Sequence, residues 1–222
     1  MTSMGTRGQP TSLTLYDHPY SPASARVRIA CKIKAVPLTL ERIALGRGAN
    51  AAQNAPEFLA INPNGLVPVL VAQYADGSKL TLSQSVAILE FLEETYAADA
   101  PWRPALLPSV KDMNERCKVR ELVMLLCADL HPPTNLRVRE LVKGLGGDVN
   151  VYVKAIFTRV FDAFEVAVKD SKGTYCVGKE VTLADICLVT MAWEWEKRED
   201  LESWPNILEI VTNCREKEAF QL

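Results

Sequence analysis

The apolar residues of this 222-residue chain change their spacing about halfway along, and that change constrains the fold more than any other feature. Before about residue 98, stretches in which apolar and polar residues alternate are interspersed with stretches of helical spacing. After Pro101, Pro104 and Pro108, the apolar residues recur only at helical spacing. Alternation is typical of strands, and a period of about 3.6 is typical of helices. We therefore expect an α/β domain followed by an all-α domain.

The front half of the chain predicts the element order β-α-β-α-β-β-α. Strands are expected at 13–16, 37–43, 67–74 and 79–82, and helices at 23–35, at 56–60 and from Ser83 onward. A helix joins the first two strands, so they should run parallel, whereas an Ala-Asp-Gly-Ser turn makes the last two an antiparallel hairpin. The sequence thus predicts a mixed four-stranded sheet with helices packed on it.

The domain boundaries follow from the same pattern. Residues 1–12 contain no apolar core, so we expect a disordered tail and not a secretory signal. The α/β domain is expected at 13–98, a proline-containing linker at 99–108 and the helical domain at 109–222. Gly144-Leu-Gly-Gly147 is expected to separate the first two helices of that domain. Its apolar stripes lie within residues 119–130, 153–164, 186–193 and 207–211.

The composition excludes several classes of function. The 25 lysines and arginines nearly balance the 27 aspartates and glutamates and are spread along the chain, which argues against a nucleic-acid partner. The longest strongly apolar run, 122–128, is far shorter than the roughly 20 residues that a membrane-spanning helix needs. Only two histidines and no clustered ligands argue against a metal site.

The six cysteines indicate a reducing compartment. None forms a C-x-x-C pair, and no secretory signal precedes them, so we expect reduced thiols and a cytoplasmic protein. Four of them lie in apolar stretches, where a thiol acts as a small hydrophobic group. The thiols expected to be buried and inert are those of Cys31, Cys127, Cys176 and Cys187.

Three short motifs in the α/β domain could bind an anionic, peptide-like ligand. Val67-Pro68 opens the third strand; a cis bond there would turn the Val67 backbone outward, and a trans proline at a strand start is the alternative. Ser83-Gln84-Ser85 opens a helix whose N-terminus favours a carboxylate, although either serine could simply cap it. Ser21 precedes the first helix, where its hydroxyl could donate to an anion or only form a turn beside Pro22.

Two further patterns bear on a helix cap and on the class of enzyme. Thr182-Leu-Ala-Asp185 precedes an apolar helix and predicts a capping box, with Asp in place of the usual Glu or Gln. No G-x-S-x-G elbow surrounds Ser21, and neither His18 nor His131 stands in a recognisable triad order. A serine hydrolase is therefore not indicated.

The order and spacing of these motifs resemble those of the glutathione transferases. More narrowly, the chain resembles the zeta class, the maleylacetoacetate isomerases. The class pattern S-S-C-x-x-R-V-R-I-A is similar to Ser21-Pro-Ala-Ser-Ala-Arg26-Val-Arg-Ile-Ala30, and residues 131–137, 175–185 and 218–221 are also close to the class form. The resemblance runs from about Leu13 to the C-terminus. It implies the glutathione transferase fold, a thioredoxin-like domain followed by a helical domain, and a homodimer.

The resemblance also implies roles for residues of the α/β domain. Ser21 would be the catalytic hydroxyl that stabilises the glutathione thiolate. Val67, before a cis Pro68, would pair with the cysteinyl backbone of glutathione. Gln84-Ser85 would hold the γ-glutamyl carboxylate, and Gln53 would sit near the glycyl end.

Other roles implied by the resemblance concern the ligand cleft and the substrate. The residues that would line the cleft from the helical domain are His131, Asn135, Leu136 and Arg137, with His131 in place of the usual Gln. Cationic groups would orient a diacid substrate. The candidates for these groups are Arg26, Arg137, Lys197 and Arg198.

Two departures from the family pattern bear on activity. The family's Ser-Ser-Cys is Ser21-Pro22-Ala23 here, so the second serine and the cysteine are absent. The segment 196–200 is one residue short, so the residue that holds the substrate carboxylate could be Lys197, Arg198 or neither.

The resemblance implies an enzyme with glutathione as its cofactor. It would isomerise maleylacetoacetate-like diacids to the fumaryl form by reversible thiolate addition, a step of aromatic amino acid catabolism. The alternative is a general glutathione S-transferase that conjugates haloacids or other small electrophiles, which the lost cysteine and the altered basic segment favour. A third reading is a protein that binds glutathione without turnover.

Overall fold

A computed structural model of the protein describes residues 8–46, 51–96 and 104–221. The chain divides into two compact units between Pro104 and Ala105. This division falls within the segment expected to be the linker, of which residues 99–103 lie outside the described residues. Most of the expected N-terminal tail, residues 1–7, also lies outside them.

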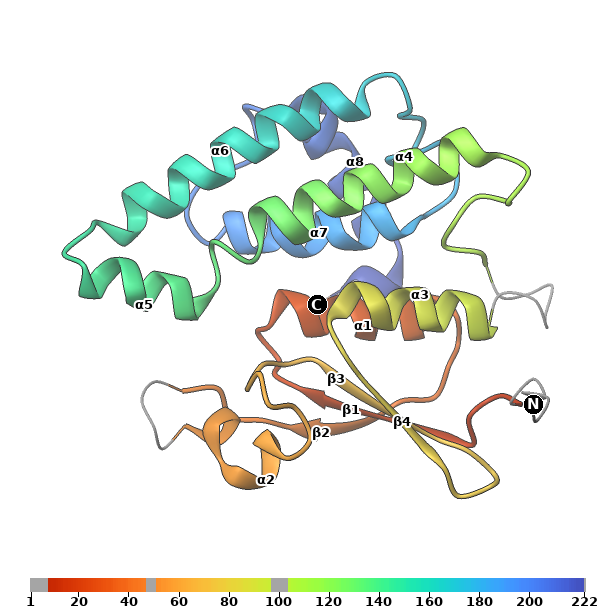
Figure 1. The fold of residues 1–222 in the computed structure, drawn as a ribbon. Helices are drawn as coiled ribbons and strands as arrows, with labels where there is room; N and C mark the ends of the chain where they lie inside the picture. The colour runs from red at the N-terminus through yellow and green to blue at the C-terminus, as the bar shows by residue number, and fades with distance from the viewer. Residues whose placement is uncertain (1–7, 47–50, 97–103, 222) are drawn as a thin grey trace. The chain divides into compact units, whose positions relative to one another are not determined.

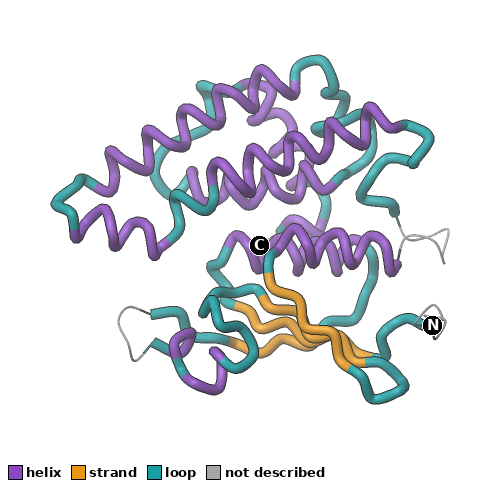
Figure 2. Tube along the Cα trace, viewed as in Figure 1, coloured by secondary structure: helices purple, strands orange, loops and turns teal. Residues whose placement is uncertain are grey.

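The N-terminal unit contains a mixed four-stranded sheet (Figure 2). Its strands are β1 (Ser12–Asp17), β2 (Thr39–Arg42), β3 (Val69–Gln73) and β4 (Lys79–Ser83), in the spatial order β2-β1-β3-β4. Strand β1 is parallel to β2 and antiparallel to β3, which forms a hairpin with β4. The element order and the pairing directions confirm the sequence prediction.

Helices α1 (Pro22–Ile33) and α3 (Ser85–Tyr96) lie side by side on one face of this sheet (Figure 1). A short helix, α2 (Pro56–Leu59), precedes β3. Apolar side chains from α1, α3 and the central strands are fully buried between the layers, among them Val27, Ile88 and Leu70. A buried ion pair joins the end of α1 to α3, with 2.6 Å between Lys34 Nζ and Glu93 Oε2.

Among the element boundaries that differ from the sequence prediction, three have clear local reasons. The first strand begins earlier, because Thr11 and Ser12 already pair with Gln73 on β3. The third strand begins at Val69, since Pro68 has no N–H to donate to the ladder. Ser83 ends β4 and does not open a helix; α3 begins two residues later.

The C-terminal unit is entirely helical, as predicted. Helix α4 (Met113–Met124) continues into a π-helical segment, Leu125–Leu130. The remaining α-helices are α5 (Leu136–Gly144), α6 (Val149–Val168), α7 (Leu183–Trp195) and α8 (Pro205–Arg215). A short 3-10 turn, Glu218–Phe220, follows them.

Helix α5 was missed by the sequence analysis. Gly144-Leu-Gly-Gly147 separates α5 from α6, and not the two helices that carry the first two apolar stripes. None of the residues of α5 is buried, and Leu141 is 61% exposed. Its apolar residues Val138, Leu141 and Val142 nevertheless recur at helical spacing, so the sequence does carry a short signal for this helix.

Helix α7 is the centre of the helical unit. Twelve of its residues are buried, so it is apolar on all sides and does not show a one-faced stripe. At its C-terminal end, Trp195 packs against Phe157 and Phe161 of α6 and against Trp204, with ring centroids 5.1 to 6.3 Å apart within this cluster. Within the described residues, no helix has both the length and the apolar character to cross a bilayer.

The predicted capping box at the start of α7 is confirmed. Thr182 Oγ1 accepts from the backbone of Ala184, while the fully buried Asp185 carboxylate accepts from Thr182 N at 2.7 Å. The same carboxylate also accepts from Cys176 N at 2.8 Å, which ties the preceding loop to the helix. Burial raises the pKa of Asp185, and the hydrogen bonds from Cys176 and Thr182 oppose that rise.

We predict that Asp185→Ala lowers the free energy of unfolding by about 2–4 kcal/mol, because it leaves two buried backbone N–H groups without acceptors. Asp148→Ala is the matched control, since Asp148 caps α6 through the backbone of Asn150 and Val151 at an exposed site. It should cost only about 1 kcal/mol. Urea unfolding followed by circular dichroism measures both, and equal losses would contradict the structural role of Asp185.

Candidate functional site

The first part of the candidate site is the start of α1. Ser21 is the N-cap residue, and its Oγ accepts from Ser24 N at 3.3 Å. Because that bond uses a lone pair, the hydroxyl proton of Ser21 stays available to donate to a ligand at the helix N-terminus. Pro22 occupies the first helical position, where an N–H has no partner inside the helix and is not needed.

The loop that leads to Ser21 is held by an arginine that the sequence analysis did not single out. Arg28 Nη2 donates to Pro19 O at 2.9 Å, and its Nη1 donates to His18 O at 3.4 Å. Arg28 and Arg42 both pair with Asp17, whose side chain is fully buried at the end of β1. These contacts link residues distant in sequence, so no local pattern predicts them. The sequence shows only that Arg26 and Arg28 alternate within the helix, without indicating their partners.

The second part is the turn into β3. Val67-Pro68 is a cis peptide bond, as the resemblance implied. The preceding loop is held by Asn62, whose Nδ2 donates to Leu66 O at 2.7 Å. Gly65 has a φ of +61°, and a Cβ there would lie 3.0 Å from Gln53 O. Glycine at 65 therefore brings the loop before Val67 against the segment that carries Gln53.

Gln53 itself holds a neighbouring loop. Its Nε2 donates to Gly46 O at 2.6 Å, and its Oε1 accepts from Gly46 N at 3.1 Å. Residues 47–50 between them lie outside the described residues. The side chain thus shapes the loop beside the candidate site.

The third part is the start of α3. Gln84 has a φ of +81° although it is not a glycine, a backbone conformation that is costly and clusters at functional sites. Its side chain is exposed, while Ser85, the first residue of the helix, is buried. The unpaired N–H groups of this helix end favour an anion.

A buried cation reinforces this anion-binding end. Arg26 projects from α1, is only 1% exposed, and its Nη1 donates to Ser85 Oγ at 3.1 Å. At that level of burial the guanidinium is placed to act through Ser85 and not by touching a substrate. The N-terminal unit thus brings Ser21, Val67-Pro68, Gln84-Ser85 and their supports Arg26 and Gln53 into one fold.

The helical unit carries the remaining candidates in two places. The first is the turn between the π-helical segment and α5. His131 N donates to Leu126 O at 3.0 Å, which is a π-type bond, and Asn135 caps α5 by accepting from Val138 N at 3.0 Å. Leu136 and Arg137 follow on the exposed first turn of α5. Asn135 therefore caps α5 in this structure.

The second place is the end of α7, where Glu194 gathers three cations. Arg139 Nη2 and Lys197 Nζ lie 2.9 and 2.7 Å from its carboxylate oxygens. Arg198 Nη1 donates to Glu194 O at 2.8 Å and lies 3.3 Å from Glu194 Oε1. Burial would raise the pKa of Glu194, but the hydrogen bonds from Lys197 and Arg139 outweigh it, so the pKa is lowered. Arg139 was missed because its pairing with Glu194 is not local, whereas the i,i+3 and i,i+4 spacing of Glu194 to Lys197 and Arg198 was a local signal that was not used.

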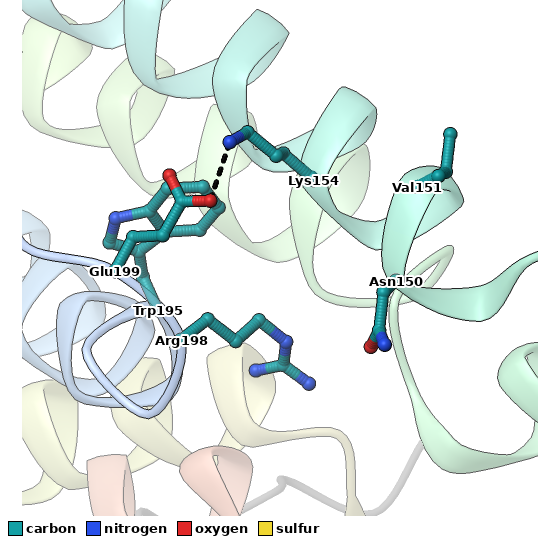
Figure 3. A pocket seen from close by; sticks show the side chains of 6 residues that line it. All are labelled: Asn150, Val151, Lys154, Trp195, Arg198 and Glu199. Atoms are coloured by element: carbon teal, nitrogen blue, oxygen red, sulfur yellow. Dashed lines mark hydrogen bonds and ion pairs between the residues drawn. The ribbon is translucent and has the colours of Figure 1, made fainter.

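Lys197 and Arg198 differ in their surroundings. Lys197 Nζ lies 3.8 Å from the centre of the Trp193 ring, so its charge is engaged by both an aromatic face and Glu194. Arg198 instead extends into a pocket of about 380 Å³ between the start of α6 and the end of α7 (Figure 3). The pocket is also lined by Asn150, Val151, Lys154, Trp195 and Glu199. Arg198 is thus the better placed of the two to meet a small anion.

Comparisons with known proteins agree with this layout. The sequence matches the family model "Glutathione S-transferase, N-terminal domain" over residues 20–95 and "Glutathione S-transferase, C-terminal domain" over residues 148–221. It is 35% identical to the maleylacetoacetate isomerase of Aspergillus fumigatus, covering 94% of this chain and 88% of that one. It is also 35% identical to a maleylpyruvate isomerase of a Ralstonia species, covering 94% and 95%.

A solved structure of a relative has a similar fold. It is the maleylacetoacetate isomerase of Anaeromyxobacter dehalogenans with glutathione (GSH) bound in its active site, which superposes with a TM-score of 0.82 at 30% identity. The alignment covers 96% of this chain and 94% of that one.

Proposed function

The chain belongs to the glutathione S-transferase family, and on that basis we propose that it catalyses the glutathione-dependent cis–trans isomerisation of maleylacetoacetate and similar maleyl diacids to their fumaryl isomers. The observation that carries the proposal is the Ser21 hydroxyl, which caps α1 through its oxygen and keeps its proton for a ligand. The matched relatives named as maleylacetoacetate and maleylpyruvate isomerases support the choice of substrate.

The residues of the N-terminal unit fit glutathione. We assign its γ-glutamyl carboxylate to Gln84-Ser85, where a helix N-terminus and the buried Arg26 both favour negative charge. The cysteinyl backbone is assigned to the backbone of Val67, and the glycyl end to the neighbourhood of Gln53. The strained Gln84 backbone supports this assignment, because such conformations cluster at ligand sites.

The energy needed to activate the thiol is within reach of Ser21. A free thiol has a pKa of about 8.5, so it is mostly protonated at neutral pH. Lowering that pKa by about two units takes roughly 2.7 kcal/mol. A hydrogen bond to a charged group supplies about 1.5–3 kcal/mol, and a helix N-terminus adds about 0.3–1 kcal/mol. Ser21 and the first turn of α1 together are sufficient.

Bound glutathione supplies a thiolate whose reversible addition to the cis double bond permits rotation about the resulting single bond. The protein's part is to hold that thiolate deprotonated through Ser21 and to orient the diacid. We assign one carboxylate of the substrate to Arg198, because its guanidinium extends into the pocket beside Asn150. Lys197 is assigned the supporting role of neutralising Glu194.

The proposal extends to the protein's setting. We propose that it acts as a homodimer in the cytoplasm, in the catabolism of tyrosine and phenylalanine. The six cysteines include no C-x-x-C pair, which fits a reducing compartment.

We predict that Ser21→Ala lowers isomerase turnover about 10- to 100-fold, because one charge-assisted hydrogen bond to the thiolate is lost. The assay follows a maleyl diacid by absorbance, with mass spectrometry of the product and titration of the bound thiol. Ser24→Ala is the matched control: its hydroxyl is buried without a partner in the described residues, and its N–H is kept.

The outcomes of this assay separate the candidate functions. Cis-to-trans conversion without net loss of glutathione supports the isomerase. A product heavier by one glutathione would indicate a conjugating transferase, and binding without turnover a silent binding protein. Full turnover in Ser21→Ala would refute the assigned role of the hydroxyl.

We predict that Arg26→Met weakens glutathione binding about 10-fold, because the positive charge behind Ser85 is lost, while Arg26→Lys keeps most of the affinity. Isothermal titration measures both affinities, and circular dichroism verifies that each variant is folded. Turnover at saturating glutathione should change little in either variant. Equal affinity in the Met and Lys variants would exclude a role for this charge.

We predict that Arg198→Gln raises the KM for the diacid about 10- to 100-fold and leaves glutathione affinity unchanged, because a charge-assisted carboxylate contact is removed. Lys197→Gln is the matched control and should alter this KM by less than about 3-fold. The reverse ranking, measured by steady-state kinetics, would move the substrate contact to Lys197.

A further inference from the structure

Two cysteines of the helical unit lie in direct contact. The Sγ atoms of Cys127 and Cys187 are 3.5 Å apart, although the residues are 60 positions apart in the chain. Cys127 belongs to the π-helical segment and Cys187 to α7, and these two elements pack against each other. The contact therefore joins two separate elements through their thiols.

The two thiols differ in access. Cys187 is fully buried, whereas Cys127 is only half-buried. The expectation that Cys127 is buried is therefore wrong, whereas Cys31, Cys176 and Cys187 are buried as expected. An oxidant in solution therefore meets Cys127 first, and Cys187 Sγ lies 3.5 Å from Cys127 Sγ.

The other cysteines lack this combination. Burial raises the pKa of Cys31 to about 12, and it also raises the pKa of Cys176, where the nearby Asp185 charge adds to the effect. Thiols held protonated and buried in this way are poor first nucleophiles toward a disulfide in solution. Cys214 is buried as well, with its pKa raised by burial, and Cys117 is exposed on the surface of α4.

We propose that Cys127 and Cys187 form a reversible redox site, which oxidised glutathione converts from two thiols to one intramolecular disulfide. The Cys127 thiolate attacks one sulfur of glutathione disulfide, which forms a mixed disulfide and releases one glutathione thiolate. The Cys187 thiol then loses its proton and attacks Cys127 Sγ, which releases the second glutathione. Two protein thiols are oxidised and one glutathione disulfide is reduced to two thiols.

The geometry demands only a small movement. A disulfide needs its sulfurs about 2.0 Å apart, so the two atoms must approach by about 1.5 Å. Cys127 lies in a π-helical turn, a rare geometry that occurs frequently at functional sites.

The test uses the full chain incubated with oxidised glutathione. We expect a mass loss of about 2 Da, loss of two of the six alkylatable thiols and a higher melting temperature, since the bond closes a long loop of the unfolded chain. Dithiothreitol should reverse all three changes. Peptide mapping should place the disulfide between Cys127 and Cys187.

Variants assign the order of attack. Cys187→Ser should stop at a mixed disulfide with glutathione on Cys127, and Cys127→Ser should show no mass loss. Cys117→Ser is the matched control and should behave like the unmodified chain. The proposal is overturned if the unmodified chain keeps six thiols or if the disulfide maps to another pair. That mapping decides the question even where a variant fails to fold.

Discussion

The hydrogen bond from Arg26 to Ser85 connects the two helices on which the N-terminal part of the site depends. It joins the side of α1 to the first residue of α3, so the ends of both helices are held against the same sheet. Burying an unpaired arginine costs free energy, so Arg26 has to keep its hydrogen-bond partner. This requirement fixes the position of Ser85 as well as that of Arg26. The same group adds positive charge behind a helix N-terminus. Structural order and the anion affinity that we propose for the start of α3 therefore have one source.

Charge is handled differently in the two units. In the N-terminal unit, Asp17 and Glu93 are buried; Asp17 pairs with two cations, Arg28 and Arg42, and Glu93 with one, Lys34. In the helical unit, Glu194 takes three cations, so the cluster keeps a net positive charge after the carboxylate is neutralised. That surplus of positive charge around Glu194 is consistent with the role that we propose for Arg198.

The sequence was enough to predict whatever depends on periodicity or on short motifs. The four strands, their directions, the capping box at Thr182 and the start of α1 after Ser21 all follow from local patterns. Contacts between distant segments could not be read in this way, which is why Arg28 and Arg139 were missed. Gln84 has a positive φ where the chain turns from β4 into α3, and its residue type does not predict that conformation.

The π-helical segment carries a consequence for the register of the site. A hydrogen bond spanning five residues, such as that from His131 to Leu126, accommodates one residue more than an α-helical turn. A π turn advances less per residue around the axis than an α turn, so Leu125–Leu130 takes up the extra residue locally and the residues after it keep the direction they would have in an α-helix. In the evolution of such a chain, one residue can be gained or lost within this segment without reorienting His131 and the turn before α5.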